Sequence, residues 1–260
     1  MKLTGAMTAI ATPMFEDGTV DYISLNNLID FQIENSISAI VAVGTTGESA
    51  TIDFEEHVSL IEYFVKYVNG RIKVIAGTGA NSTIEALELT KSAKDAGADA
   101  ALLVSPYYNK PTQEGLYQHY KAINDNCGIP IIIYNIPSRS VIDMSVETMA
   151  RLYELRNIVG VKDATGDLER VDKQKSKMGE EFIQLTGNDD NAFEFNKRGG
   201  VGTISVTANI APKLCSDFQK FSKSNNQEEQ KEAERLDQIL QPLHTNLFIE
   251  SNPSPVKYVA

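Results

Sequence analysis

Eight short apolar segments recur along the chain and constrain its fold more than any other feature. They follow one another at intervals of roughly 30 residues, about the length of one strand–helix–strand step. They are rich in β-branched residues and almost continuously apolar, as parallel strands covered on both faces should be. We predict strands at residues 7–13, 39–44, 73–78, 100–106, 130–136, 159–164, 182–187 and 202–207.

Most of the stretches between these segments have helical periodicity. Ile84, Leu87 and Ala93, for example, would share one face of a helix that ends at an Ala-Gly-Ala turn. Eight alternations of strand and helix predict an α/β fold of the (β/α)8 TIM barrel type, which a chain of 260 residues can form as one domain. The alternative is a doubly wound open sheet, but the first strand lacks the glycine-rich phosphate turn that usually follows it.

We expect the barrel to be the catalytic domain and to occupy residues 1–212. Residues 213–260 are expected to form a C-terminal helical extension with two helices between Lys213 and Phe248. The acidic and basic residues of the second helix are most simply a solvated face.

Charge and composition exclude several function classes. The net charge of -11, without any cluster of Lys and Arg, argues against nucleic acid as a partner. There is no apolar run of about 18 residues and no charged-then-apolar leader, so we expect a cytoplasmic protein without membrane contact. Cys127 and Cys215 read as reduced, structural thiols. His57, His119 and His244 are scattered, and we predict no metal site.

One lysine stands at the end of an otherwise apolar predicted strand. Side chains alternate along a strand, so Lys162 should share a face with Gly160, while Val159 and Val161 take the other face. If the valines pack under the helices, Lys162 points into the barrel mouth and Gly160 leaves room below it. Burial disfavours an unpaired ammonium, and the neutral amine is a nucleophile for carbonyl carbons. The alternative is a surface lysine whose stem snorkels to water.

Further polar residues follow the predicted strands at the same end, where barrel enzymes place their catalytic groups. Taken singly, Thr45 and Thr46 could cap a helix, Tyr107 and Tyr108 could be packing aromatics, and Arg139 could be a surface charge. Together, their convergence with the lysine at one end of the barrel favours a catalytic site.

Four motifs carry a resemblance to a known family: GTTGES (44–49), YYNKP (107–111), YNIPSR (134–139) and GVKDAT (160–165). Over essentially its whole length the chain resembles the dihydrodipicolinate synthase family of pyruvate-dependent class I aldolases. The resemblance implies a homotetrameric TIM barrel, a dimer of dimers, in lysine (diaminopimelate) biosynthesis. It also implies condensation of pyruvate with L-aspartate 4-semialdehyde to 4-hydroxy-tetrahydrodipicolinate, without a metal or organic cofactor.

The resemblance assigns catalytic roles to four residues. Lys162 would form a Schiff base with pyruvate, and Tyr134 beside it would donate and accept protons. Thr45 and Tyr108 would complete a proton relay with Tyr134. Tyr108 would reach in from a neighbouring subunit.

Four further residues are expected to bind substrate. Thr46 suits the pyruvate carboxylate, and the family places Gly187 and Ile204 in the wall of the site. Arg139 suits the carboxylate of the semialdehyde, because a guanidinium binds a carboxylate bidentately.

Alternative functions remain open at this point. N-acetylneuraminate lyase resembles the same scaffold but lacks the arginine in that motif. The first alternative is another pyruvate aldolase, such as that lyase or a 2-keto-3-deoxy-sugar-acid aldolase. The second alternative is a catalytically silent barrel that retains a ligand site, although the intact set of candidate residues argues against it.

Feedback-sensitive members that this sequence resembles bind L-lysine in a cleft between subunits. The matching positions here are Ser49, Ala50, His57, Asn81, Glu85 and Tyr107. Alternatively, Asn81 and Glu85 simply begin the helix after the third strand, where a carboxylate favours the helix dipole.

Three departures from the family pattern bear on these expectations. Phe54 replaces a frequent histidine, so we expect weaker inhibition by lysine. Asp163 stands where glutamate is common, and we expect little effect. The family usually continues beyond residues 252–257, and its further helical part would pack outside the barrel; without it we expect exposed apolar surface and altered subunit packing.

Overall fold

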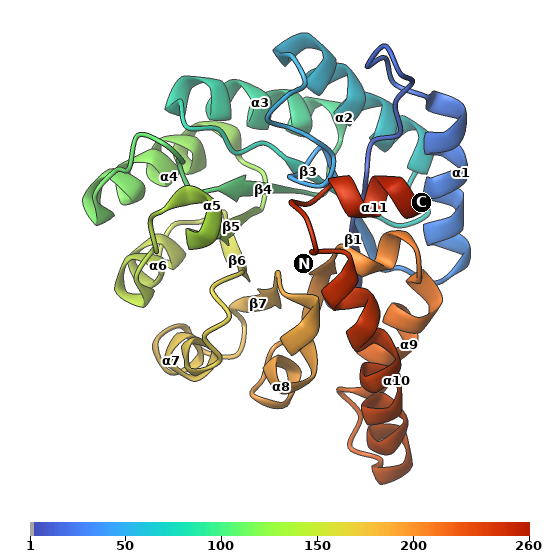
Figure 1. The fold of residues 1–260 in the computed structure, drawn as a ribbon. Coiled ribbons are helices and arrows are strands. Elements are labelled where there is room, and N and C mark those ends of the chain that lie inside the picture. Colours follow the sequence, from blue (N-terminus) through green and yellow to red (C-terminus); the bar gives the residue numbers. More distant parts are fainter. Residues whose placement is uncertain (1–2) are drawn as a thin grey trace.

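A closed barrel of parallel strands forms the centre of the computed structural model, which describes residues 3–260 (Figure 1). Each strand pairs with the next, and the first pairs with the eighth, so the barrel has no free edge. This confirms the predicted TIM barrel. The strands are β1 (Gly5–Ala9), β2 (Ala39–Ala42), β3 (Lys73–Gly77), β4 (Ala100–Val104), β5 (Ile131–Asn135), β6 (Ile158–Asp163), β7 (Ile183–Thr186) and β8 (Gly202–Ser205).

The helices surround this barrel as an outer ring, and α10 and α11 follow the last strand (Figure 1). Several begin at an N-cap whose side chain accepts a backbone N–H of the first turn, such as Asp53 for α2 and Ser82 for α3. The helices are α1 (Tyr22–Glu34), α2 (Phe54–Val68), α3 (Thr83–Ala96), α4 (Gln113–Cys127), α5 (Pro137–Ser140), α6 (Val146–Tyr153), α7 (Glu169–Met178), α8 (Ala192–Lys197), α9 (Pro212–Phe221), α10 (Gln227–Asn246) and α11 (Ser254–Val259).

Alternation along the strands divides the apolar core into an inner and an outer part. On β5, Ile131 and Ile133 pack outward against the helices, whereas Ile132 and Tyr134 face the barrel interior. This is the alternation expected of the predicted strand. It sets Tyr134 inside the barrel, at the end of β5 that leads to the cavity described below.

The predicted alternation of β6 is wrong at one position. Val161 packs under the helices as expected, but Val159 packs against the inner cluster. The register between β5 and β6 shifts by one residue here, because Ile131 pairs with Ile158 and the next residue, Ile132, pairs with Gly160. Such a bulge breaks the two-residue period. The alternation resumes beyond it, so Lys162 still points inward.

Gly160 serves a different purpose from the one expected. A side chain there would meet the backbone oxygen of Ile183 at 2.2 Å, so the glycine allows close approach of β7 rather than making room below Lys162.

Several strand ends and one helix also differ from the expectations. The first strand was predicted to reach Pro13 but ends at Ala9, the last residue of β1 that pairs with β2. Helix α11 was not predicted. It lies over the edge of the barrel opening, near β1 in Figure 1. Within residues 3–260, no helix is long and apolar enough to cross a membrane.

Candidate active site

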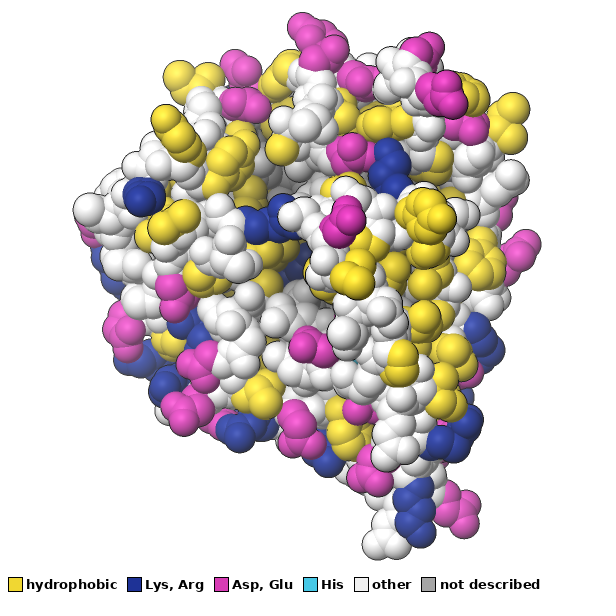
Figure 2. All heavy atoms as spheres, in the orientation of Figure 1, with side chains coloured by type: hydrophobic (Ala, Val, Ile, Leu, Met, Phe, Trp, Pro, Cys, Tyr) yellow, Lys and Arg dark blue, Asp and Glu magenta, His cyan; other side chains and the backbone are white. Residues whose placement is uncertain are grey.

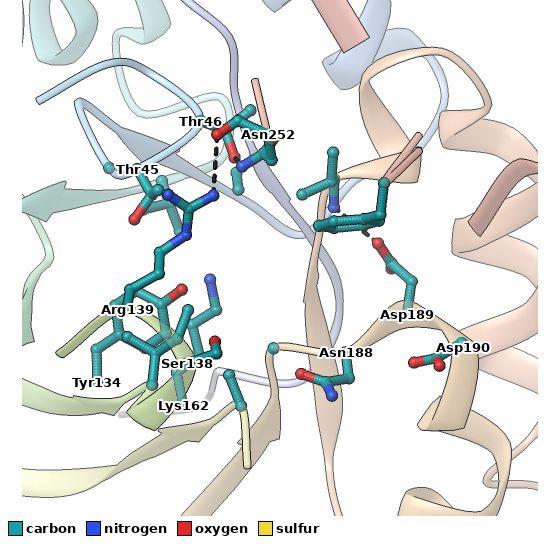
Figure 3. Close-up of a pocket in the computed structure, with 18 of the residues that line it drawn as sticks. Thr45, Thr46, Tyr134, Ser138, Arg139, Lys162, Asn188, Asp189, Asp190 and Asn252 are labelled. Carbon is teal, nitrogen blue, oxygen red and sulfur yellow. Dashed lines mark hydrogen bonds between the residues drawn. The ribbon is translucent and has the colours of Figure 1, made fainter. Parts of the chain in front are cut away.

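A cavity of about 650 Å³ opens at the end of the barrel where the strands finish. Figure 2 shows this face hollowed at its centre, with basic side chains inside the hollow. Lys162 and Arg139 line the cavity, together with Thr45, Thr46 and Tyr134 (Figure 3). With Gly187, described below, the structure therefore brings six of the predicted site residues together at one cavity.

Lys162 and Tyr134 form the floor of this cavity. They are register partners on the neighbouring strands β6 and β5. The Lys162 side chain is only 5% exposed, and its Nζ lies 4.2 Å from the centre of the Tyr134 ring. Within the described part of the chain, Lys162 forms neither an ion pair nor a side-chain hydrogen bond. The cavity thus contains a buried amine beside the Tyr134 ring.

Gly187 makes space for this amine. A side chain at that position would approach Lys162 Cε and Ala164 Cβ to 2.9 Å each, so only glycine leaves room for the lysine stem. Gly187 also lines the cavity, at the end of β7.

A polar layer behind the floor holds the end of β6. Asp163 directs its carboxylate away from the cavity, and its oxygens accept four hydrogen bonds. The Thr165 backbone N–H and hydroxyl donate at 3.0 and 2.6 Å, Arg170 Nε at 2.9 Å and Gln174 Nε2 at 3.0 Å. Asp163 and Arg170 are both buried. These four hydrogen bonds to one buried carboxylate fix the backbone beside Lys162.

The same layer also holds the end of β5. Asn135 donates to the Asp143 carboxylate at 2.7 Å and accepts the Met144 backbone N–H at 3.0 Å. Arg170 donates to the Asp143 carboxylate at 3.2 Å and to the Met144 carbonyl at 2.7 Å. One guanidinium therefore ties together the residues that follow Tyr134 and Lys162, which fixes the spacing of the two strand ends.

The upper part of the cavity is built around Asn252. Its amide Nδ2 donates to Thr46 Oγ1 at 3.0 Å, and its backbone carbonyl accepts a hydrogen bond from Arg139 Nη2 at 3.0 Å (Figure 3). The residue lies in the loop between α10 and α11. A part of the chain expected to form a C-terminal helical extension therefore contributes a residue to the cavity.

A second cavity of about 340 Å³ adjoins the first one. Five of the six predicted lysine-site residues line it, namely Ser49, Ala50, His57, Glu85 and Tyr107. Both cavities are lined by Thr45, Ile136, Arg139 and Asn252. The two spaces are thus separated by a wall of shared residues.

Titratable groups from several segments line the second cavity. Burial raises the pKa of Tyr107, and the charge of the nearby Glu85 carboxylate raises it further. Burial lowers the pKa of His57, and its hydrogen bond to the Gly77 carbonyl, 2.7 Å away, opposes that shift. At neutral pH, His57 and Tyr107 therefore remain uncharged. The Glu85 side chain lines the same cavity and has no ion-pair or hydrogen-bond partner among residues 3–260, so it can pair with a cation.

Comparison with known proteins places the chain in a family. The sequence model of the Dihydrodipicolinate synthetase family matches residues 2–260. The chain belongs to this dihydrodipicolinate synthetase family. The 4-hydroxy-tetrahydrodipicolinate synthase of Pelagibacter ubique is 68% identical over 256 residues, which cover 98% of this chain and 87% of the relative.

Solved structures of the family have the same fold. Chloride-inhibited dihydrodipicolinate synthase from Acinetobacter baumannii, complexed with pyruvate, has a TM-score of 0.94 at 51% identity and covers 99% of this chain and 87% of that chain. A DHDPS from Cyanidioschyzon merolae with lysine bound has a TM-score of 0.93 at 35% identity, with coverage of 98% and 87%.

Three of the predicted site residues line neither cavity. Tyr108 is 88% exposed, at the tip of the loop after β4. Ile204 is fully buried in the inner cluster below the active-site cavity, whereas Val206, two residues further along, lines it. Asn81 does not line the second cavity; its carbonyl accepts a hydrogen bond from Asn109 at 3.0 Å.

Several residues that line the active-site cavity are not among the predicted site residues. Asn188 and Asp189 come from the loop after β7, and His244, Phe248 and Asn252 come from the last part of the chain. A polar run after a predicted strand was the available signal for the first two. The pattern of residues 213–260 contains no comparable signal, because helix periodicity does not reveal which end of a barrel a helix approaches. Among residues 3–260, no cluster of three or more His, Cys, Asp or Glu could hold a metal ion.

Proposed function

We propose that this chain condenses pyruvate with L-aspartate 4-semialdehyde to give 4-hydroxy-tetrahydrodipicolinate, in lysine (diaminopimelate) biosynthesis. The observation that carries this proposal is the buried, unpaired amine of Lys162 in one cavity with the guanidinium of Arg139. The similarity to 4-hydroxy-tetrahydrodipicolinate synthases, at 68% identity for the Pelagibacter ubique relative, supports it.

Lys162 begins the reaction as a nucleophile. Its neutral amine attacks the ketone carbon of pyruvate, and loss of water from the carbinolamine leaves an iminium. The iminium withdraws electrons from the adjacent methyl group, which makes its protons acidic. Loss of one methyl proton gives an enamine, whose carbon adds to the aldehyde of the second substrate. The amine of that substrate then displaces Lys162 as the ring closes, which regenerates the enzyme.

Tyr134 is the proposed proton carrier for these steps. Its ring centre lies 4.2 Å from Lys162 Nζ, which keeps the side chain close to the forming carbinolamine, and a phenol hydroxyl can donate and accept protons. Thr45 lines the same cavity and suits a relay from the tyrosine to the adjoining loops.

The two substrate carboxylates have separate candidate partners. The Thr46 hydroxyl suits the carboxylate of pyruvate. Arg139 suits the carboxylate of the semialdehyde, because a charge-assisted bidentate pair combines binding strength with orientation. A neutral sugar aldehyde would leave this guanidinium without an anion. The direct test is a steady-state assay with pyruvate in which the semialdehyde competes with neutral sugar aldehydes. A preference for the sugar would indicate a different pyruvate aldolase.

Tyr108 is proposed to act in the active site of a neighbouring subunit of a homotetramer. Its side chain projects into solvent from a backbone with φ of 70°, a conformation that residues other than glycine rarely adopt. The hydrogen bond from Asn109 to the Asn81 carbonyl stabilises this turn. The exposed side chain is therefore accessible to a neighbouring subunit.

Complementation tests the exchange of Tyr108 between subunits. Lys162→Met and Tyr108→Phe subunits, each nearly inactive alone, are co-expressed with different tags and purified as the mixed oligomer. We expect activity to return, because an intact Lys162 then meets an intact Tyr108 from the other subunit. A mixed oligomer no more active than its parents would place Tyr108 in its own subunit's site or remove it from catalysis.

The second cavity is proposed to bind L-lysine as an inhibitor. Glu85 can pair with an ammonium group, and Tyr107 can donate to a carboxylate or contact the aliphatic stem. The wall shared with the active site gives a bound amino acid direct contact with Thr45 and Arg139. Contiguity alone does not demonstrate coupling, so inhibition must be measured.

A lysine titration of Glu85→Ala tests this proposal. We expect the half-inhibitory lysine concentration to rise at least about tenfold, because a hydrogen bond to a charged group contributes about 1.5–3 kcal/mol. Glu88→Ala is the matched control, since Glu88 lies one helical turn further along α3, outside the cavity. Absence of inhibition in the unmutated enzyme, or an equal effect of both substitutions, would contradict this site.

A further inference from the structure

The loop between α10 and α11 returns to the barrel and crosses the edge of the active site. Asn252 in this loop contacts both Thr46 and Arg139. Just after the loop, Lys257 of α11 forms an ion pair with Glu48, which lies in the loop after β2. Asn252 is 7% exposed, and 206 residues separate it from Thr46 in sequence. The loop therefore supplies a buried polar residue to a site formed by distant strands.

The direction of the bond between Asn252 and Thr46 carries chemical information. A threonine hydroxyl has a single proton and can also accept hydrogen bonds. Because the Asn252 amide donates to Thr46 Oγ1, the hydroxyl does not need its own proton for this contact. Thr46 Oγ1 has no other hydrogen-bond partner within residues 3–260, and the residue lines the active-site cavity. The hydroxyl proton is thus available to a ligand.

Asn252 also affects the second candidate anion-binding group. Its backbone carbonyl accepts a hydrogen bond from one N–H of the Arg139 guanidinium and so orients that group. The other N–H groups of the guanidinium have no hydrogen-bond partner within the described residues. One residue therefore contacts the candidate partners of both substrate carboxylates (Figure 3).

We propose that Asn252 is a positioning residue for pyruvate. Its amide donates to the Thr46 oxygen, which leaves the Thr46 hydroxyl proton to donate to the pyruvate carboxylate. This inference rests on the proposed function and deepens it. The Oδ1 atom of Asn252 is buried and has no hydrogen-bond partner in the described chain. The donating nitrogen is therefore the part of the side-chain amide that the site uses.

A purely structural role for Asn252 makes a different prediction. If the side chain only fastened the loop, aspartate would replace it well, since it has the same size and could accept a hydrogen bond from Thr46. In the positioning role, aspartate is worse than alanine. Its carboxylate would take the Thr46 proton, turn the hydroxyl oxygen toward pyruvate and add a negative charge near the substrate anion.

The experiment measures the KM for pyruvate, and the pyruvate dependence of borohydride trapping, in Asn252→Ala and Asn252→Asp. We expect KM to rise about five- to tenfold in the alanine variant, the effect of losing one neutral hydrogen bond, and further in the aspartate variant. In a Thr46→Val background, Asn252→Ala should have little additional effect on this KM, because the two residues act through one contact. Asn246→Ala is the matched control: among residues 3–260, its side chain donates a hydrogen bond only to the Pro242 carbonyl on α10.

Thermal unfolding of each variant separates loss of the site from loss of the fold. An aspartate variant that binds pyruvate better than the alanine variant, or equal effects of Asn252→Ala with and without Thr46, would overturn the inference. Failure of the unmutated enzyme to trap pyruvate would instead overturn the proposed function, so the two failures are distinguishable.

Discussion

Lys162→Met should abolish both turnover and the covalent capture of pyruvate. Methionine has nearly the same length and can occupy the space between Tyr134 and Gly187, but it has no amine to form an imine. Loss of a covalent nucleophile commonly costs several orders of magnitude in rate, and we expect at least about a 1000-fold decrease in kcat. Steady-state assay of pyruvate-dependent semialdehyde consumption measures it.

Two controls accompany this variant. Lys231→Met removes an exposed lysine of α10 and should leave activity unchanged. Lys162→Arg keeps a positive charge in the cavity without a nucleophilic amine, and it should be as inactive as the methionine variant. Substantial activity in Lys162→Arg would show that the residue acts through its charge and would rule out imine chemistry.

Arg139→Ala should raise the KM for L-aspartate 4-semialdehyde by about 10- to 100-fold, because a carboxylate loses a charge-assisted partner worth about 1.5–3 kcal/mol. Trapping of pyruvate at Lys162 should persist, since Arg139 contacts the other end of the cavity. Arg139→Lys should recover only part of the loss, because an ammonium lacks the bidentate fork.

Substrate preference gives the sharpest readout for Arg139. The unmutated enzyme should prefer the semialdehyde to uncharged aldehydes, and the alanine variant should lose most of that preference. An unchanged KM for the semialdehyde, or an equal loss for charged and uncharged aldehydes, would contradict the assigned role.

Sequence patterns predicted the barrel and assigned the candidate site residues to one of its ends. Nearly continuous apolar runs predicted the strands, and in the structure Tyr134 of β5 lies inside the barrel together with Ile132. Since the ends of parallel strands meet at one face of a barrel, residues that follow different strands could be assigned to a common site. Lys162, Thr45 and Arg139 do line one cavity.

The bulge in β6 could not be predicted from the sequence. Val159 and Val161 have the same hydrophobicity, so the apolar pattern cannot show that one faces inward and the other outward. The cause lies in the pairing with β5 and in the close approach of the Ile183 backbone to Gly160. Both are tertiary contacts, and the alternation rule holds only between such interruptions.

The contact between Asn252 and Thr46 could not be predicted from the sequence either, because it is also a tertiary contact. Local patterns describe neighbours along the chain, whereas this residue reaches Thr46 from 206 positions away. Tyr108 presents the opposite case. Sequence resemblance assigns it a role, but in the single chain its side chain is exposed and lines neither cavity, so its proposed action in a neighbouring subunit rests on the complementation experiment.

Reductive trapping tests the central claim most directly. The unmutated protein is incubated with pyruvate alone, treated with borohydride, digested and mapped by mass spectrometry. The proposed mechanism predicts a reduced pyruvyl group on the peptide that contains Lys162, in a yield that increases with pyruvate concentration and falls to zero in Lys162→Met. Active enzyme whose Lys162 peptide remains unmodified, or that carries the adduct on a different lysine, would contradict it.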